Sequence, residues 1–493
     1  MSCYQSTRNQ TINITETEAI LQGISKEGGL FVPKELPKMD FELNALLDFD
    51  YQTLAYRVIR LFFDNLKEED LKGCIAHAYD EKFDTPMIAP VKTTQTAHFL
   101  ELFHGPTLAF KDMALSILPY LMTTSKRYEQ EDKEIIILTA TSGDTGKAAL
   151  EGFADVPGTK IIVFFPEEGV SDVQKRQMTT QKGENTLVVG IKGNFDDAQT
   201  GVKQIFADQA FEAELAAQGF VFSSANSINI GRLVPQVVYY FYAYGRLAQE
   251  GSLQVGEPMN VVVPTGNFGN ILAAYYAKCM GLPIGKFICA SNKNNVLTDF
   301  FEKGIYDRRR DFFVTNSPSM DILISSNLER FLYYMCEGDT TLVTEFMEDL
   351  RTKGYYKVTE KMQEKMQLFE AGFADDETTL AMIKKVYEEE NYLMDTHTAV
   401  AYAVYDSYKT RTKDLTPTVI ASTASPYKFT GSVMCALDKK YETQNDFVLL
   451  KEMEKLLNNQ MPEGIRGIET LPIRHQCVCE VTRMKETIAD FLK

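Results

Sequence analysis

Short apolar runs recur through the middle of the chain, and amphipathic stretches typical of helices separate nearly all of them. Strands that are apolar at every position are buried on both faces, as in parallel sheets covered by helices. The runs predicted to be strands lie at 134–139, 159–165, 186–190, 220–224, 259–264, 286–291 and 418–422. The pattern predicts α/β architecture with open, mostly parallel sheets and helices on both faces, and ligands then bind at the carboxyl ends of the strands.

The length of 493 residues is enough for about three domain-sized units. Helical patterning in the first part of the chain, for example at 51–66, predicts an N-terminal helical domain. We expect an N-terminal unit at 1–92, a small α/β unit at 93–225 and a large α/β unit at 226–493, which includes helical insertions and a C-terminal extension. The late strand within this last unit is expected to rejoin the central sheet.

Composition excludes several classes of protein. Hydrophobic residues make up 44% of the chain and charged residues 24%, and no apolar run approaches the roughly 18 residues of a membrane span. The first residues show no export signal, so we expect a cytoplasmic protein without a membrane partner. The net charge of −17 argues against a nucleic-acid partner.

The eight cysteines are scattered and form no CxxC pair, which argues against a disulfide framework and a structural zinc site. Cys477 and Cys479 with His475 could hold a metal, but this spacing is a weak signal and burial in a packed core is the commoner role. We therefore expect no metal.

Two glycine-containing loops follow predicted strands. PTGNFGN, at 264–270, precedes a predicted helix, so its backbone N–H groups can surround an anion at the helix N-terminus, although such residues also form ordinary turns. ATSGDTGKAA, at 140–149, has the same placement but is neither a nucleotide P-loop nor a GxGxxG dinucleotide motif. Together they indicate a phosphorylated cofactor beside a substrate that carries a carboxylate or a phosphate.

Lys111 lies in the largely apolar segment 102–114. Burial favours the neutral amine, which is the form that attacks an aldehyde in Schiff-base chemistry. A lysine at a helix start beside Asp112 is more often a surface cation, so this residue alone does not establish catalysis.

Several segments, in this order, resemble the signature sequences of threonine synthases: GGLFVP, HGPTLAFKD, TATSGDTG, SANSINIGRL, PTGNFGN and DTHTAVAY. They resemble the shorter bacterial and fungal branch, which belongs to the fold type II enzymes that use pyridoxal 5′-phosphate (PLP) and share the tryptophan synthase β-like fold. The resemblance implies a Schiff base between PLP and Lys111, and Thr423 against the pyridine nitrogen. It also implies that the cofactor phosphate is held by Gly266, Asn267, Phe268, Gly269 and Asn270.

The sequence departs from the family near Thr423. Family members usually read TAHPAKF, whereas this chain has Ser425 in place of the histidine and Tyr427 in place of the alanine. This departure leaves local substrate contacts open.

The reaction implied by the resemblance converts O-phospho-L-homoserine and water to L-threonine and phosphate, with Lys111 as the general base. The residues expected to contact the substrate are Thr141, Ser142, Asp144 and Thr145 for its carboxylate, and Asn226, Ser227, Asn229, Arg232 and Lys428 for its phosphate. Each has a structural alternative, such as a turn former or a helix cap. His104 and His397 are left out of the catalytic set, because lone histidines are commonly satisfied packing residues.

Three other functions remain open. A serine or threonine dehydratase, or a cysteine synthase, would share PLP and both loops but would need no second phosphate site. A phospholyase that forms an oxoacid and ammonia would need that site. The third is a PLP-binding protein without turnover. The sequence is compatible with a monomer or a homodimer.

Overall fold

The computed structural model describes residues 3–141, 143–167 and 170–493, whose strands form four sheets. One has five parallel strands in the order β16-β8-β7-β6-β9. Its strands are β6 (Glu134–Ala140), β7 (Thr159–Pro166), β8 (Thr186–Ile191), β9 (Phe220–Ser223) and β16 (Cys477–Cys479). Four of these were predicted, and β16 was not.

The second large sheet has six strands in the order β14-β11-β10-β15-β5-β4, of which only β4 is antiparallel to its neighbour. Its strands are β4 (Val91–Thr93), β5 (His98–Glu101), β10 (Met259–Pro264), β11 (Ile284–Ser291), β14 (Phe369–Phe373) and β15 (Thr418–Ser422). The predictions for 259–264, 286–291 and 418–422 are confirmed, and the late strand β15 does join this sheet, between β10 and β5.

Both large sheets are covered on two faces, as continuous apolar strands require. In the five-stranded sheet, Ile136 and Leu138 belong to a core shared with α8, α9 and α20, whereas Ile135 and Ile137 belong to a core shared with α5 and α6. These helices are α5 (Leu118–Tyr128), α6 (Asp144–Phe153), α8 (Phe195–Ala207), α9 (Gln209–Ala217) and α20 (Met484–Phe491). The expected α/β architecture is confirmed here.

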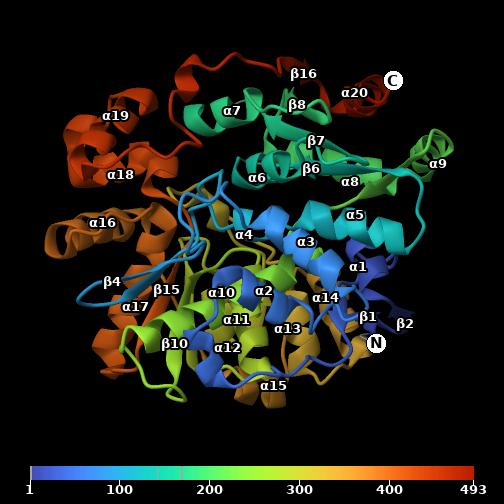
Figure 1. Ribbon diagram of the computed structural model, residues 1–493. Coiled ribbons are helices and arrows are strands. Elements are labelled where there is room, and N and C mark those ends of the chain that lie inside the picture. Colours follow the sequence, from blue (N-terminus) through green and yellow to red (C-terminus); the bar gives the residue numbers. More distant parts are fainter. Residues whose placement is uncertain (1–2, 142, 168–169) are drawn as a thin grey trace.

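The six-stranded sheet follows the same rule. Val261 and Val263 share a core with α10, α11 and α12, and Val262 between them shares a core with α16 and α17 on the opposite face. These helices are α10 (Ile230–Gln249), α11 (Gly269–Met280), α12 (Val296–Lys303), α16 (Asp376–Glu390) and α17 (Thr396–Thr412). In Figure 1 the five-stranded sheet lies at the top, and α10 and α11 lie below it.

The N-terminal segment contains the expected helices together with a small antiparallel sheet in the order β2-β1-β3. Its elements are β1 (Tyr4–Ser6), β2 (Asn9–Ile14), α1 (Glu16–Gln22), β3 (Phe31–Pro33), α2 (Tyr51–Ile59) and α3 (Glu68–Ala78). The sheet was not predicted because β1 and β3 have three residues each and β2 reads NQTINI, so none carries a strand-like apolar pattern.

The remaining elements surround these sheets. They are α4 (Asp112–Leu115), α7 (Asp172–Thr179), β12 (Ile305–Asp307), α13 (Leu328–Met335), α14 (Thr340–Thr352), β13 (Tyr355–Lys357), α15 (Glu360–Met366), α18 (Thr430–Leu437) and α19 (Asp446–Leu457), with short 3-10 helices between some of them. The strands β12 and β13 form an antiparallel pair.

Each large sheet contains strands from more than one of the three predicted units. The unit proposed at 93–225 includes β5, which pairs with β15 in the six-stranded sheet. The unit proposed at 226–493 sends β16 back to the edge of the five-stranded sheet, next to β8. The red C-terminal segment in Figure 1 crosses over the top of the molecule to make this contact. The boundaries themselves stay a proposal.

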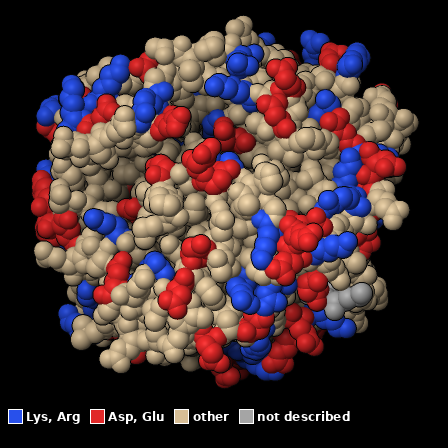
Figure 2. Space-filling view, viewed as in Figure 1, with Lys and Arg blue, Asp and Glu red and all other residues tan. Residues whose placement is uncertain are grey.

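Charged side chains of both signs are interspersed over the face shown in Figure 2. Within the described ranges, no helix combines the length and the apolar character that a membrane crossing requires. The same residues include no group of three or more His, Cys, Asp or Glu side chains placed to hold a metal ion.

His104 connects β5 to the N-terminal segment. Its Nδ1 lies 2.5 Å from Asp84 Oδ1 and its Nε2 lies 3.0 Å from Glu101 Oε2. Burial alone would lower the pKa of His104, but the hydrogen bonds and charges of these two carboxylates raise it to about 9. This histidine, left out of the catalytic set, is an ion-pair residue.

We therefore predict a pH-dependent stabilisation by His104. Because its folded-state pKa is raised, the contribution is fully present below the unfolded-state pKa and is lost as the pH rises through about 9. His104→Gln should lower the free energy of unfolding by about 2 kcal/mol near pH 6 and should have little effect near pH 10. Denaturant unfolding of both proteins at the two pH values measures this difference.

His98→Gln is the matched control, because burial lowers the pKa of His98. The contribution of His98 to the free energy of unfolding therefore has the opposite pH dependence: it is present at high pH and is lost as the pH falls. Equal destabilisation by His104→Gln at both pH values would contradict the predicted ion pairing.

Candidate active site

Lys111 and Thr423 are far apart in the sequence and adjacent in the fold. The Phe110 amide donates to the Thr423 carbonyl oxygen at 2.8 Å, and Ala109 forms a β-bridge with Ala424. Thr423 directly follows β15, and α4 begins directly after Lys111. This pairing places both residues at the carboxyl end of the six-stranded sheet, where ligands bind in such folds.

The Lys111 amine is buried, with 9% of the residue exposed. Its Nζ lies 3.4 Å from Asp144 Oδ2 and 3.4 Å from Ser319 Oγ. Burial lowers the pKa of Lys111, and the positive charges of Lys428 and Arg232 lower it further, while Asp144 opposes the shift. The neutral amine needed for attack on an aldehyde is therefore favoured.

Asp144 joins the groups around the lysine. Its Oδ1 lies 3.3 Å from Lys428 Nζ and accepts a hydrogen bond from Gln174 Nε2 at 2.7 Å. Its Oδ2 accepts from Ser319 Oγ at 3.0 Å. Burial would raise the pKa of Asp144, but Lys428 and Lys111 hold it far below its usual range. Asp144 is therefore an ionised carboxylate.

The ATSGDTG loop is folded around Thr141. The Thr141 Oγ1 accepts from the Gly143 amide at 3.0 Å and from the Gly146 amide at 2.9 Å. Helix α6 begins at Asp144, so the amides of Asp144 and Thr145 lack intrahelical partners and can bind an anion. Ser142 lies outside the described residues.

The PTGNFGN loop leads from β10 into α11. Phe268 has a φ of 64° in the left-handed region, which is costly for a bulky residue and lets the chain turn sharply into α11 at Gly269. Asn270 Oδ1 accepts from the Tyr240 hydroxyl, and the Asn270 Nδ2 is buried without a hydrogen-bond partner within the described structure. The loop thus presents an unsatisfied donor at a helix N-terminus.

The segment between β9 and α10 carries the other predicted residues. Asn226 accepts from Thr139 Oγ1 at 3.3 Å, and Ser227 Oγ accepts from Asn327 Nδ2 at 3.4 Å. Asn229 is fully buried and caps α10, accepting from the Gly231 amide at 2.8 Å and donating to two backbone carbonyls. Its side chain is occupied by the backbone, so we leave it out of the proposed ligand contacts.

Arg232 is 3% exposed and donates through Nη1 to the Ala225 carbonyl oxygen at 2.9 Å. Its Nε has no partner among the residues that the structure describes. Burial lowers the pKa of Arg232 to about 10. Buried charges normally have partners, so this guanidinium is suited to an anionic ligand.

These features fit PLP. The buried lysine suits its aldehyde, and the unsatisfied Asn270 amide in the PTGNFGN loop suits its phosphate. Only glycine is accommodated at position 266 of the same loop, because a Cβ there would lie 2.7 Å from the Ser319 carbonyl oxygen and would clash with it. Lys111, Thr423 and residues 266–270 would hold the cofactor.

The sequence left His397 out of the catalytic set and did not single out Ser319 or Gln174. His397 is 2% exposed, and its Nε2 accepts from the Ser319 amide at 3.1 Å. The DTHTAVAY segment contains this histidine, but nothing in the local pattern shows that it reaches a loop from elsewhere in the chain.

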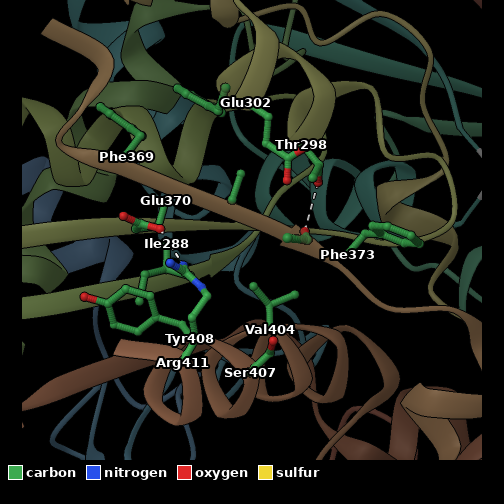
Figure 3. A pocket seen from close by; sticks show the side chains of 13 residues that line it. Ile288, Thr298, Glu302, Phe369, Glu370, Phe373, Val404, Ser407, Tyr408 and Arg411 are labelled. Carbon is green, nitrogen blue, oxygen red and sulfur yellow. Dashed lines mark hydrogen bonds and ion pairs between the residues drawn. The ribbon is translucent and has the colours of Figure 1, made fainter. Parts of the chain in front are cut away.

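A separate cavity of about 550 Å³ lies at the edge strand β14, between α12 and α17. Figure 3 shows Arg411 pointing toward Glu370. Thr298 Oγ1 donates to the Gly372 carbonyl oxygen at 2.9 Å. None of its lining residues is a predicted site residue. This cavity is therefore distinct from the group around Lys111.

The chain matches three family profiles: threonine synthase N terminus at 3–79, pyridoxal-phosphate dependent enzyme at 97–423, and threonine synthase C-terminal at 398–488. It is 41% identical over 485 residues to human threonine synthase-like 1, covering 95% of this chain but only 63% of that protein. It is 36% identical over 486 residues to Saccharomyces cerevisiae threonine synthase, covering 92% of this chain and 93% of the relative.

A crystal structure of PLP-bound threonine synthase from Brucella melitensis matches with a TM-score of 0.88 and 34% identity, over all of both chains. The fold type II architecture and the PLP cofactor expected from the sequence are thereby confirmed. The chain belongs to the threonine synthase family of pyridoxal-phosphate-dependent enzymes.

Proposed function

We propose that this protein is a threonine synthase, which converts O-phospho-L-homoserine and water to L-threonine and phosphate. The observation that carries the proposal is Arg232, a buried guanidinium whose charge lowers the pKa of Lys111 and whose Nε has no partner within the described ranges. A dehydratase acting on serine or threonine needs no such cation for a substrate phosphate. The relatives named threonine synthase support the same reaction.

The reaction requires a group that moves protons at three substrate carbons, Cα, Cβ and Cγ. PLP, when bound, stabilises negative charge on the substrate. Lys111 Nζ takes up the proton from Cα and then the proton from Cβ, and phosphate leaves from Cγ. The lysine ammonium returns one proton to Cγ, water adds at Cβ, and a proton returns to Cα. The burial of Lys111 allows the amine to act as a base near neutral pH.

Asp144 has a different role from the one its loop suggests. An ionised carboxylate repels the substrate carboxylate, so we assign that contact to the backbone amides of residues 144 and 145 and the side chain of Thr145. The Asp144 side chain instead stabilises the ammonium form of Lys111 after each proton uptake. Ser142, which lies outside the described residues, stays a predicted contact.

We assign the substrate phosphate to Arg232, with Asn226, Ser227 and Lys428 as further contacts. Lys428 Nζ donates to the Thr107 carbonyl oxygen at 2.7 Å and also contacts Asp144. It therefore has partners already, whereas Arg232 keeps a free donor. This difference makes Arg232 the principal phosphate contact.

The eight free thiols support a cytoplasmic location, where thiols remain reduced. We propose a monomer or a homodimer. The net charge of −17 supports the absence of a nucleic-acid partner.

Product analysis tests the reaction. Purified protein loaded with PLP should release phosphate and threonine in equal amounts from O-phospho-L-homoserine. Lys111→Ala should lower the rate by about 1,000-fold or more, because it removes the proposed proton carrier. Phosphate accompanied by ammonia and an oxoacid would instead identify a phospholyase, and binding without product would identify a PLP-binding protein.

Arg232→Gln tests the phosphate contact. Loss of a charge-assisted interaction should raise the KM for O-phospho-L-homoserine by about 10- to 100-fold. Arg127→Gln is the control, because Arg127 is exposed and pairs with Asp70 on α3. Arg232→Lys, which keeps the charge, should recover part of the loss, and thermal unfolding checks that each variant is folded. An unchanged KM in Arg232→Gln would exclude this contact.

Asp144→Asn tests the carboxylate beside the lysine. Since Asp144 raises the pKa of Lys111 against the effect of burial, its removal should lower that pKa further. In the PLP-free protein, labelling of Lys111 by an amine reagent at several pH values, read by mass spectrometry, reports this shift. A higher Lys111 pKa in the variant would contradict the role assigned to Asp144.

A further inference from the structure

Residues 315–327, here called the cover segment, lie between β12 and α13 beside the proposed cofactor site. Asp321 fixes this segment to the end of β11. Its Oδ1 accepts from Asn292 Nδ2 at 2.7 Å and from Asn294 Nδ2 at 2.9 Å, and its Oδ2 accepts from the Thr315 amide at 3.0 Å. The segment therefore has a defined position although it contains no strand.

The cover segment also holds the PTGNFGN loop. Ser325 Oγ donates to the Gly266 carbonyl oxygen at 2.6 Å, and the Asn327 amide donates to the Asn267 carbonyl oxygen at 3.0 Å. The Ser319 carbonyl oxygen lies so close that a Cβ on Gly266 would be 2.7 Å from it. The backbone shape of the proposed phosphate site thus depends on the placement of this segment.

His397, on α17, supplies a third attachment. Its Nε2 lies 3.1 Å from the Ser319 amide, and its Nδ1 lies 2.8 Å from Asp395 Oδ1. A backbone N–H can only donate, so Nε2 must be the acceptor, and the ring proton must be on Nδ1, where it donates to Asp395. The contact therefore requires a neutral His397.

We propose that His397 is a positioning residue, whose neutral ring holds the cover segment against Gly266 and Lys111 and thereby retains PLP. The proposal rests on the cofactor site of the proposed function and adds a role that the catalytic steps do not use. Ser319 transmits the effect, since its Oγ lies 3.4 Å from Lys111 Nζ and donates to Asp144 Oδ2 at 3.0 Å.

The geometry gives this contact a pH dependence. When His397 takes up a second proton, its Nε2–H faces the N–H of Ser319, and the hydrogen bond is lost. Three carboxylates act on the ring: Asp395 on α17 by direct contact, and Asp144 on α6 and Asp321 in the cover segment by charge. The Phe429 ring packs against it and carries no charge. Retention of PLP should therefore weaken in acid.

Two substitutions test the contacts of the two ring nitrogens separately. The side-chain amide of glutamine lies about as far from the backbone as Nε2 of histidine does. His397→Gln therefore keeps an acceptor for the Ser319 amide at every pH. Asparagine reaches only to about the position of Nδ1, so His397→Asn keeps a partner for Asp395 and loses the acceptor for Ser319. The two variants are thus matched in chemistry: His397→Gln keeps the contact with Ser319 and loses the side-chain contact with Asp395, and His397→Asn does the reverse.

The experiment measures the rate of PLP release from each holoprotein in the absence of substrate, near pH 8 and near pH 5.5. We expect His397→Asn to release PLP about 10-fold faster than wild type near pH 8, as for the loss of one buried hydrogen bond. His397→Gln should match wild type near pH 8 and release PLP more slowly than wild type near pH 5.5.

Equal release by wild type and His397→Asn, or the same acid sensitivity in wild type and His397→Gln, would overturn the proposal. If His397→Asn fails to fold, the comparison of wild type with His397→Gln still decides it. Because no turnover is involved, failure here is distinguishable from failure of the proposed reaction, which product analysis alone tests.

Discussion

The contact of Asp144 with Lys111 and Lys428 is the interaction on which the rest of the site depends. Asp144 begins α6, the helix that follows β6 of the five-stranded sheet. Lys428 lies in the turn after β15 of the six-stranded sheet, and the loop that carries Lys111 is bridged to the same turn through Ala109 and Ala424. Breaking a buried ion pair leaves an uncompensated charge, which is strongly destabilising. The carboxylate therefore holds the two sheets together at the position where the cofactor and substrate must meet.

The charges around this contact are not balanced by the protein alone. Lys428 and Arg232 are buried cations, and Asp112 is a further buried carboxyl, whose pKa burial raises to about 6. Asp112 is engaged by the Thr107 amide and hydroxyl at 2.8 and 2.6 Å. Among the residues that the structure describes, no carboxylate pairs with Arg232, so a ligand with an anionic group fits this site better than a neutral one.

The sequence predicted the parts of this protein whose signal is local. Continuous apolar runs located the central strands, because burial on both faces removes polar positions, and the loops after β6 and β10 were visible from their glycines. The contact between His397 and Ser319 was not predictable, because it joins a helix to a loop that no pattern pairs. The same holds for β16, a three-residue edge strand.

Of the two departures from the family near Thr423, Tyr427 contacts the C-terminal extension and Ser425 contacts its own turn. Tyr427 OH donates to Asn459 Oδ1 at 2.8 Å, and Ser425 Oγ accepts from the Tyr427 amide at 3.4 Å, so both residues serve the packing of this turn. The same extension touches the loop that leads to Lys111: a Cβ on Gly464 would lie 2.2 Å from the Pro106 carbonyl oxygen. Lys428 Nζ donates to the carbonyl oxygen of Thr107, the next residue in that loop, at 2.7 Å. The extension and the turn that contains Lys428 therefore both contact the loop that leads to Lys111. Tyr427 and Ser425 thus belong to the packing of the turn that precedes Lys428.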